Sequence, residues 1–296
     1  MWSMGADDWI KYGWDSGKWV PGAQLTIDLR SKEIAGNLDI HHVAVSAVHK
    51  IVDTYPAPFT LMCSGGIDSQ TMIWCWSLAK VPFNIMSTRY KSNGVFFNEY
   101  DLVSLRDFCN TNSFTITYQD FDLINFLEFG LPDIARDNDC DSPQICTHIK
   151  MTESITSGTV CFSGNCLMPR AHLNYTLLGM HRYALRSSTQ SRQIIPFFLL
   201  HDPVLAKSFV KTSASFKSLD DIYRLAGVPI VSPPSKYNGF ENIKEFYDKY
   251  YDRVTTVDRL QYAAKPSKRV FDLLFRHPYE GAGNQYKDSV QVNQIL

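Results

Sequence analysis

The chain has 296 residues, of which 45% are hydrophobic and 20% are charged, and its 29 basic and 30 acidic residues leave a net charge of −1. This composition excludes a disordered chain, and the absence of a broad cationic field argues against a dedicated nucleic-acid binder. We expect no membrane span, because no apolar run approaches the roughly 18 residues that a spanning helix needs. The seven cysteines lack the spacing of a disulfide scaffold. Because the first residues also lack signal-peptide features, the expected location is the cytoplasm.

The N-terminal part is expected to form a small β-element followed by a helix. Residues 24–29 alternate as in a strand, and a hairpin with its turn at Ser31 and Lys32 fits this stretch. Residues 39–55 carry apolar side chains at steps of three and four, which predicts a helix that ends before Pro56. We therefore expect a lead-in segment over residues 1–55.

Strands and helices then alternate up to residue 165. Short apolar runs predict strands at 59–63, 83–88, 114–118 and 158–162, and the patterns between them predict helices at 67–80, 98–110 and 144–154. The helix at 67–80 is apolar on nearly all sides, which indicates that it is buried. This alternation is typical of an α/β fold with a parallel sheet of the five-stranded, Rossmann-like type and helices on both faces.

The rest of the chain is expected to be mostly helical, with helices at 171–186, 203–211, 218–226 and 240–251. We thus expect an α/β core over residues 56–165 and a helical region over 166–296 that packs on it. Arg182, Arg186 and Arg192 lie on or just after one of these helices. They form either a solvated face or a cationic group that neutralises a polyphosphate.

The most informative segment is the sequence LMCSGGIDS at residues 61–69, between the first core strand and the first core helix. Two glycines let the backbone approach a ligand closely, and the amides at the start of a helix favour an anion. Asp68 is suited to hold a Mg²⁺ ion that phosphates share. The segment therefore predicts a pyrophosphate-binding turn, and the alternative is an ordinary strand-to-helix turn. Neither a Walker loop nor the dinucleotide-binding glycine pattern occurs.

This string resembles the PP-loop of the N-type ATP pyrophosphatases, a superfamily that includes asparagine, NAD and GMP synthetases, deazaguanine nitrile synthases and several tRNA thiolases. Residues 21–28, 161–165 and 195–205 also resemble segments of the synthetase domain of asparagine synthetases. The resemblance implies an adenine nucleotide α-hydrolase-like fold. It also implies a reaction that cleaves ATP to AMP and pyrophosphate and transfers AMP to a substrate oxygen, from which a nucleophile displaces it.

The resemblance further implies the cofactors, ATP and Mg²⁺, and the roles of individual residues. The implied metal ligand is Asp68, and Asp141, with Asp139 as the alternative, is expected to replace the acidic ligand that the second loop of the family supplies. The implied catalytic residues are Asp68, Ser64, Asn165 and Lys211, with Lys236 as the alternative lysine. The implied nucleotide-binding residues come from the two loops and the second core strand: Ser64, Gly65, Gly66, Ile67, Asp68, Ser69, Ser87, Ser163 and Gly164.

Two departures from the family pattern bear on the reaction. Residue 2 is Trp, where the amidotransferase members begin with a catalytic cysteine, so we expect no glutaminase domain. The nitrogen is then expected from ammonia or from a separate amine-donor protein. The second loop is acidic in the family, whereas this chain has Asn165, Cys166 and Met168 there.

The main hypothesis is an asparagine-synthetase-like, AMP-forming ligase, which activates a carboxylate or carbonyl oxygen of a small-molecule acid for attack by ammonia or an amine. One alternative is a PP-loop enzyme that thiolates or amidates a nucleobase of RNA or DNA. The other is a nucleotide-binding or structural protein that has lost catalysis.

The cysteines and one histidine offer a weaker signal for zinc or sulfur chemistry. Cys140, Cys146, His148, Cys161 and Cys166 lie within one stretch, but no tight pair of the kind found in structural zinc sites occurs. Buried thiols are the favoured interpretation. In a thiolase, Cys166 would be the residue that carries sulfur.

Overall fold

The structure is a computed structural model of the chain, and it describes residues 10–11, 14–15, 18–19, 25–28, 39–92, 94–138, 143–164, 191–213, 219–232 and 290–293.

Five parallel strands form the central sheet, and one short antiparallel strand joins it at the end of β6. In chain order the parallel strands are β5 (Phe59–Met62), β6 (Asn84–Ser92), β8 (Ile116–Asp122), β9 (Gly158–Phe162) and β10 (Arg192–Ile195). Their order across the sheet is β8-β6-β5-β9-β10, and β7 (Val95–Phe96) runs antiparallel to the end of β6. The expected α/β fold with a five-stranded parallel sheet is confirmed.

This strand order gives the sheet a point at which its connections change direction. From β5 the chain moves through β6 to β8, crosses back to β9 on the other side of β5, and continues to β10. β5 and β9 pair in register from Phe59 opposite Thr159 to Met62 opposite Phe162, so both strands end at the same level. In open α/β sheets, ligands bind in the crevice at the carboxyl ends of such a strand pair.

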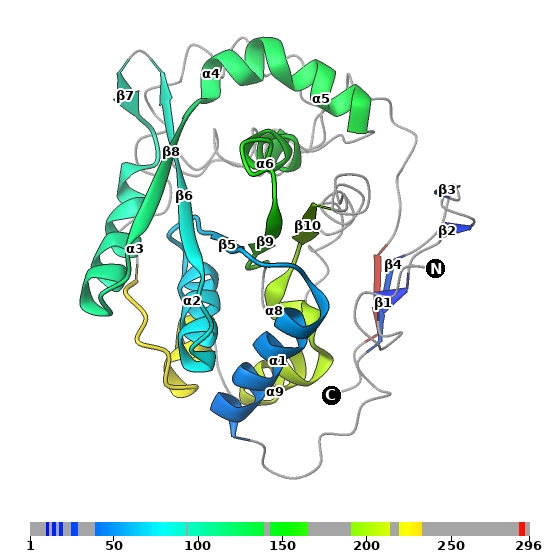
Figure 1. Ribbon diagram of the computed structural model, residues 1–296, viewed down its shortest axis with the longest axis vertical. Coiled ribbons are helices and arrows are strands. Elements are labelled where there is room, and N and C mark those ends of the chain that lie inside the picture. The colour runs from blue at the N-terminus through cyan, green and yellow to red at the C-terminus, as the bar shows by residue number, and fades with distance from the viewer. Residues whose placement is uncertain are drawn as a thin grey trace, which may run out of the picture.

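Helices cover both faces of the sheet, as right-handed crossovers require. On one side α1 (Ile40–Thr54) packs on α2 (Ile67–Ala79), and α8 (Phe198–His201), α9 (Pro203–Ser213) and α10 (Leu219–Leu225) pack with them. The crossover from β6 to β8 contains α3 (Glu99–Thr111). The crossover to β9 contains α4 (Leu123–Asn125), the π-helical turn η1 (Phe126–Gly130), α5 (Leu131–Asn138) and α6 (Pro143–Thr152). Figure 1 shows α4, α5 and α6 across the sheet from α1, α2, α8 and α9.

The helix α2 lies in the core and is buried on nearly all sides, as its sequence predicts. The Trp76 ring is fully buried, and its centroid lies 5.0 Å from that of Phe59, 6.1 Å from that of Phe83 and 6.4 Å from that of Phe198. These three rings come from β5, from the residue that precedes β6, and from α8. One aromatic cluster therefore fixes α2 to the sheet and to the later helices.

The structure confirms most of the predicted elements between residues 39 and 162, with shifts of one to four residues at their ends. Neither β10 nor the helical segment from α4 to α5 was predicted from the sequence. Because β10 pairs with β9, the sheet draws on residues beyond the expected core boundary at 165. The helices expected at 171–186 and 240–251 lie outside the described residues.

The expected hairpin at the N-terminal end is not the pairing that the structure shows. The predicted strand is present as β4 (Leu25–Asp28), but it pairs antiparallel with β1 (Ile10–Lys11), which precedes it, and parallel with β11 (Val290–Asn293). β2 (Trp14–Asp15) and β3 (Lys18–Trp19) form a separate antiparallel pair. Ser31 and Lys32 lie outside the described residues.

No helix in the described part of the chain has the length and hydropathy of a membrane span.

Gly158, at the start of β9, is expected to be intolerant of any side chain. Its φ is +81°, and a Cβ there would overlap the carbonyl oxygen of Pro58. We expect Gly158→Ala to lower the free energy of unfolding by about 3 kcal/mol, because backbone strain and overlap add. Gly94 is the matched control, because its φ is +80° and nothing lies within 4 Å of the added Cβ. Gly94→Ala should cost only about 1 kcal/mol in urea unfolding, and equal losses in the two variants would contradict the overlap.

His201 is expected to make folding sensitive to acid. Its side chain is 8% exposed, and burial lowers its pKa to about 4. Since an unfolded histidine has a pKa near 6.5, the unfolded state binds more protons between about pH 4 and 6.5. The contribution of His201 to the free energy of unfolding therefore falls as the pH falls through this window, by about 3 kcal/mol.

The variant His201→Gln should flatten that part of the curve when unfolding is measured by urea at several pH values. The exposed His49, changed in the same way, is the control. A curve for His201→Gln that runs parallel to the wild-type curve would contradict the assignment.

Candidate functional site

The loop after β5 delivers the start of α2 to the crevice at the carboxyl end of the sheet. Gly66 is the N-cap of α2, with φ −66° and ψ 164°, and no side chain caps the helix there. Gly65 has a φ of +92°, a conformation that glycine adopts without strain. Ser64 is exposed, and Gly66, Ile67 and Asp68 are partly exposed. The first turn of a 13-residue helix thus presents its amides without a side-chain cap, which favours an anion.

Two side chains set the direction of the peptide bond between Gly65 and Gly66. The carbonyl of Gly65 accepts hydrogen bonds from Gln70 Nε2 at 3.1 Å and from Ser104 Oγ at 3.0 Å. Both donors are buried, so this carbonyl faces the interior. Because the C=O and N–H of a trans peptide point in opposite directions, the amide of Gly66 faces away from the interior.

Gln70 also ties the loop to the chain beyond α10. Its Nε2 donates to the Val231 carbonyl at 2.8 Å, and its Oε1 accepts from the Val231 amide at 2.8 Å. The Gln70 side chain is fully buried and satisfies both backbone groups of Val231. The buried amide therefore joins three backbone groups, and its loss would leave them without these partners.

The two serines of the motif contact each other across the turn. The Ser64 amide donates to Ser69 Oγ at 3.1 Å, and the two hydroxyl oxygens lie 3.3 Å apart. Ser69 is 2% exposed, whereas Ser64 is exposed. Ser69 thus holds the turn from inside, and Ser64 is the hydroxyl that solvent or a ligand reaches.

Asp68 lies in the first turn of α2, where the helix dipole favours its negative charge. One carboxylate oxygen accepts a hydrogen bond from the hydroxyl of Tyr223, on α10, at 2.5 Å. No group of three or more His, Cys, Asp and Glu side chains gathers among the described residues. A single carboxylate nevertheless fits Mg²⁺, since this ion is commonly bound by one or two carboxylates together with phosphates and water.

The second loop, Ser163 and Gly164, lies next to the first because β9 is the neighbour of β5. The Ser163 carbonyl accepts from the Leu199 amide at 3.1 Å. Gly164 has a φ of +67°, and a Cβ there would lie 2.6 Å from the Phe197 ring. The two loops that the sequence predicts as a nucleotide site therefore flank the same switch point of the sheet.

Residues 195–205, which resemble a family segment, contact the second loop on its interior side. Asp202 Oδ1 accepts from the amides of Val204 at 2.7 Å and Leu205 at 3.0 Å, which caps the start of α9. Its other oxygen accepts from Lys50 Nζ at 2.5 Å. Both oxygens of this carboxylate therefore have partners within the fold, one at the start of α9 and one on α1. The segment in turn positions Phe197, on which Gly164 of the second loop packs.

Four further predicted site residues are Ser87, Lys211, Asn165 and Asp141, and the structure describes the side chain of Ser87 among them. The Ser87 side chain is fully buried, and its hydroxyl donates to the Cys63 carbonyl at 2.7 Å, so it holds the end of β5. Lys211 lies on α9, which packs on α1 and α10. Asn165 and Asp141 lie outside the described residues. The roles of all four remain predictions.

Arg192 is not a polyphosphate ligand in this arrangement. It begins β10, opposite Gly158, at the amino ends of the strands. Its Nη1 donates to the carbonyls of Thr152 and Ile155, both at 3.1 Å. The guanidinium therefore binds the end of α6 on the edge away from the loops. Arg182 and Arg186 lie outside the described residues.

The described cysteines are thiols in the core, which agrees with the favoured interpretation of their sequence pattern. Cys63, Cys75, Cys109, Cys146 and Cys161 are all buried, and none of them forms a disulfide. Burial raises the pKa of Cys63 and of Cys161, the two that lie nearest the loops, well above the ordinary value. Neither is a reactive thiolate.

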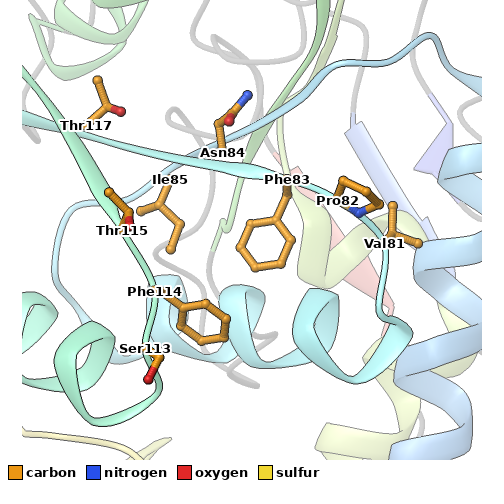
Figure 2. Close-up of a pocket in the computed structure, with 9 residues that line it drawn as sticks. All are labelled: Val81, Pro82, Phe83, Asn84, Ile85, Ser113, Phe114, Thr115 and Thr117. Atoms are coloured by element: carbon orange, nitrogen blue, oxygen red, sulfur yellow. The ribbon is translucent and has the colours of Figure 1, made fainter.

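The cavity in Figure 2 lies at the opposite edge of the sheet from the two loops. It has a volume of about 400 Å³ and is lined by residues 81–85, 113–115 and 117, which begin β6 and β8 or precede them. Phe83 and Phe114 face each other in it, with centroids 5.7 Å apart. This hollow belongs to the amino ends of the strands and is not the candidate site.

Comparisons with known proteins leave the family of the chain open. No protein-family model and no curated protein matches the sequence. Among solved structures, the U34-tRNA thiolase NcsA from Methanococcus maripaludis, with its 4Fe–4S cluster, matches over 72% of this chain and 73% of that chain. The sequence identity is 10% and the TM-score is 0.34. A likeness at this level carries no argument about activity, so the fold assignment rests on the strand order itself.

Gln70, Ser104, Tyr223 and Val231 are the site residues that sequence reasoning missed. Gln70 directly follows the motif, and its burial in an apolar helix was the one available signal. Ser104 lies 39 residues from the carbonyl that it contacts, and Tyr223 lies 155 residues from Asp68. No spacing rule links residues so far apart in the chain.

Replacing Gln70 by leucine is expected to lower the free energy of unfolding by about 3 kcal/mol, because backbone groups of Gly65 and Val231 lose buried partners. Urea unfolding measures this loss. Thr71→Val is the control in the same buried turn, since the Thr71 hydroxyl bonds only the helix carbonyl of Ile67. That change should cost less than about 1 kcal/mol, and similar losses for both variants would contradict the role of Gln70.

Proposed function

We propose that this chain is a PP-loop-type enzyme that binds ATP, cleaves it to AMP and pyrophosphate, and transfers AMP to an acceptor oxygen. The observation that carries the proposal is the position of the two motif loops, which flank the switch point between β5 and β9. A turn with the same glycines anywhere else on the sheet would be an ordinary connection.

The residues present fit the phosphates of a nucleotide. The outward amide of Gly66 and the uncapped first turn of α2 supply donors, and the exposed Ser64 hydroxyl supplies another. Asp68 would hold the magnesium ion. When bound, this ion offsets negative charge on the pyrophosphate that leaves. The remaining work of the loop is to orient the bond between the α and β phosphates, which is positioning and electrostatics.

The acceptor is either a carboxylate, as in an amide-forming ligase, or a carbonyl oxygen of a nucleobase. Both oxygens accept AMP in the same way. The two acceptor classes differ in the nucleophile that then displaces AMP. Ammonia or an amine, delivered by a separate protein, would complete an amide or an amidated base. Sulfur transfer would need an accessible cysteine. Cys63 and Cys161 do not meet this requirement, because both are buried. For that reaction Cys166 is the residue to examine.

The decisive experiment is incubation of the full chain with α-³²P-ATP, Mg²⁺ and an ammonium salt as nucleophile, with a panel of amino acids and other carboxylic acids in one arm and RNA and DNA in the other. Appearance of AMP in one arm identifies the acceptor class. Appearance of ADP, or of neither product with any acceptor, would overturn the proposal.

The change Asp68→Asn is expected to lower AMP and pyrophosphate formation by more than about 100-fold, because the amide keeps the shape of the side chain but loses the charge that holds the metal. Asp107→Asn, on the exposed side of α3, is the matched control and should leave the rate unchanged. Thermal unfolding of both variants shows whether the fold is intact. Wild-type turnover by Asp68→Asn would refute the metal role.

A further inference from the structure

The hydroxyl of Tyr223 reaches the candidate metal ligand from inside the protein. Tyr223 lies on α10, and its Oη donates to Asp68 Oδ1 at 2.5 Å. The tyrosine is fully buried, whereas Asp68 is partly exposed at the loop. The hydrogen bond therefore joins a rigid interior group to the one carboxylate of the motif.

The tyrosine ring is held in place on several sides. It packs edge-on against Phe209 of α9, with the ring centroids 5.2 Å apart and the planes at 89°. The Val228 amide donates to the Tyr223 carbonyl at 3.0 Å, and the turn that follows uses Gly227 at φ +82°. The chain then reaches Val231, which the Gln70 side chain binds. The stretch from Tyr223 to Val231 is thus held against α2 at both of these residues.

A hydrogen bond from a fixed donor limits the rotation of a carboxylate. The bond is strong because the acceptor is charged. A ligand group that is already oriented loses less freedom when it binds a metal, and partners that orient metal ligands typically change metal affinity by about 10–100-fold when they are removed. Tyr223 meets the structural requirements for such a partner.

We infer that Tyr223 is a positioning residue that orients the Asp68 carboxylate for the magnesium ion of Mg-ATP. The inference rests on the proposed function of the loop. It extends the site to residues 219–231, beyond all the segments that resemble the family.

The test measures ATP binding to the full chain by calorimetry, once with Mg²⁺ and once with EDTA. The dissociation constant with EDTA divided by the dissociation constant with Mg²⁺ reports the contribution of the metal. Tyr223→Phe removes only the hydroxyl and keeps the ring on Phe209, and we expect it to reduce this ratio by about tenfold. Asp68→Asn should abolish the magnesium dependence, and the double variant should match Asp68→Asn alone.

Tyr55→Phe is the matched hydroxyl deletion, because the Tyr55 ring packs against His201, with centroids 5.7 Å apart, and has no contact with the motif among the interactions of the described residues. It should keep the wild-type ratio. Melting temperatures of all variants separate a loss of fold from a loss of metal binding.

Two results would overturn the inference, and they can be told apart. If Tyr223→Phe keeps the wild-type ratio while Asp68→Asn loses it, Tyr223 is purely structural and the proposed function stands, whatever the melting temperature shows. If the wild type binds no ATP, or binds it equally well with Mg²⁺ and with EDTA, the metal role of Asp68 fails and the inference fails with it.

Discussion

The orientation of one peptide bond, between Gly65 and Gly66, decides what the end of β5 is able to bind. Its carbonyl is drawn inward by Gln70 and Ser104, so its amide faces the crevice beside the first turn of α2. Reversing this peptide would point an oxygen at an incoming phosphate and replace attraction by repulsion. The buried donors are therefore as important to anion binding as the amides that touch the anion.

The composition of α2 follows from this requirement. Its C-terminal half is apolar and centres on Trp76, which packs against rings from β5, from the residue before β6, and from α8. Its first turns contain the buried polar residues Ser69, Gln70 and Thr71, each hydrogen-bonded to a backbone group. One half thus anchors the helix while the other half shapes the loop, which is why the helix lacks the usual division into a polar and an apolar face.

The features that the sequence predicted well are those encoded over short distances. Residues 59–69 contain the pattern of a strand, a turn and the start of a helix in one continuous stretch. The motif residues are adjacent in the sequence, so the motif could be recognised from the sequence alone. β10 was missed because Arg192 and Gln193 obscure the apolar pattern of a short strand. α5 was missed because Pro132 interrupts the helical pattern, although helical backbone continues into α5 directly from η1. The partner of β4 and the contact of Tyr223 with Asp68 depend on residues far away in the chain. Patterns of local spacing do not contain such information.

The parallel pairing of β4 with β11 joins segments near the two ends of the chain. Closing a loop of about 260 residues costs only slightly more entropy than closing one half as long, since the cost grows with the logarithm of the length. Contacts of such high sequence separation nevertheless form slowly. Assembly of this small sheet is therefore a late event in folding, and on the ribosome it must wait until residues 290–293 have been synthesised.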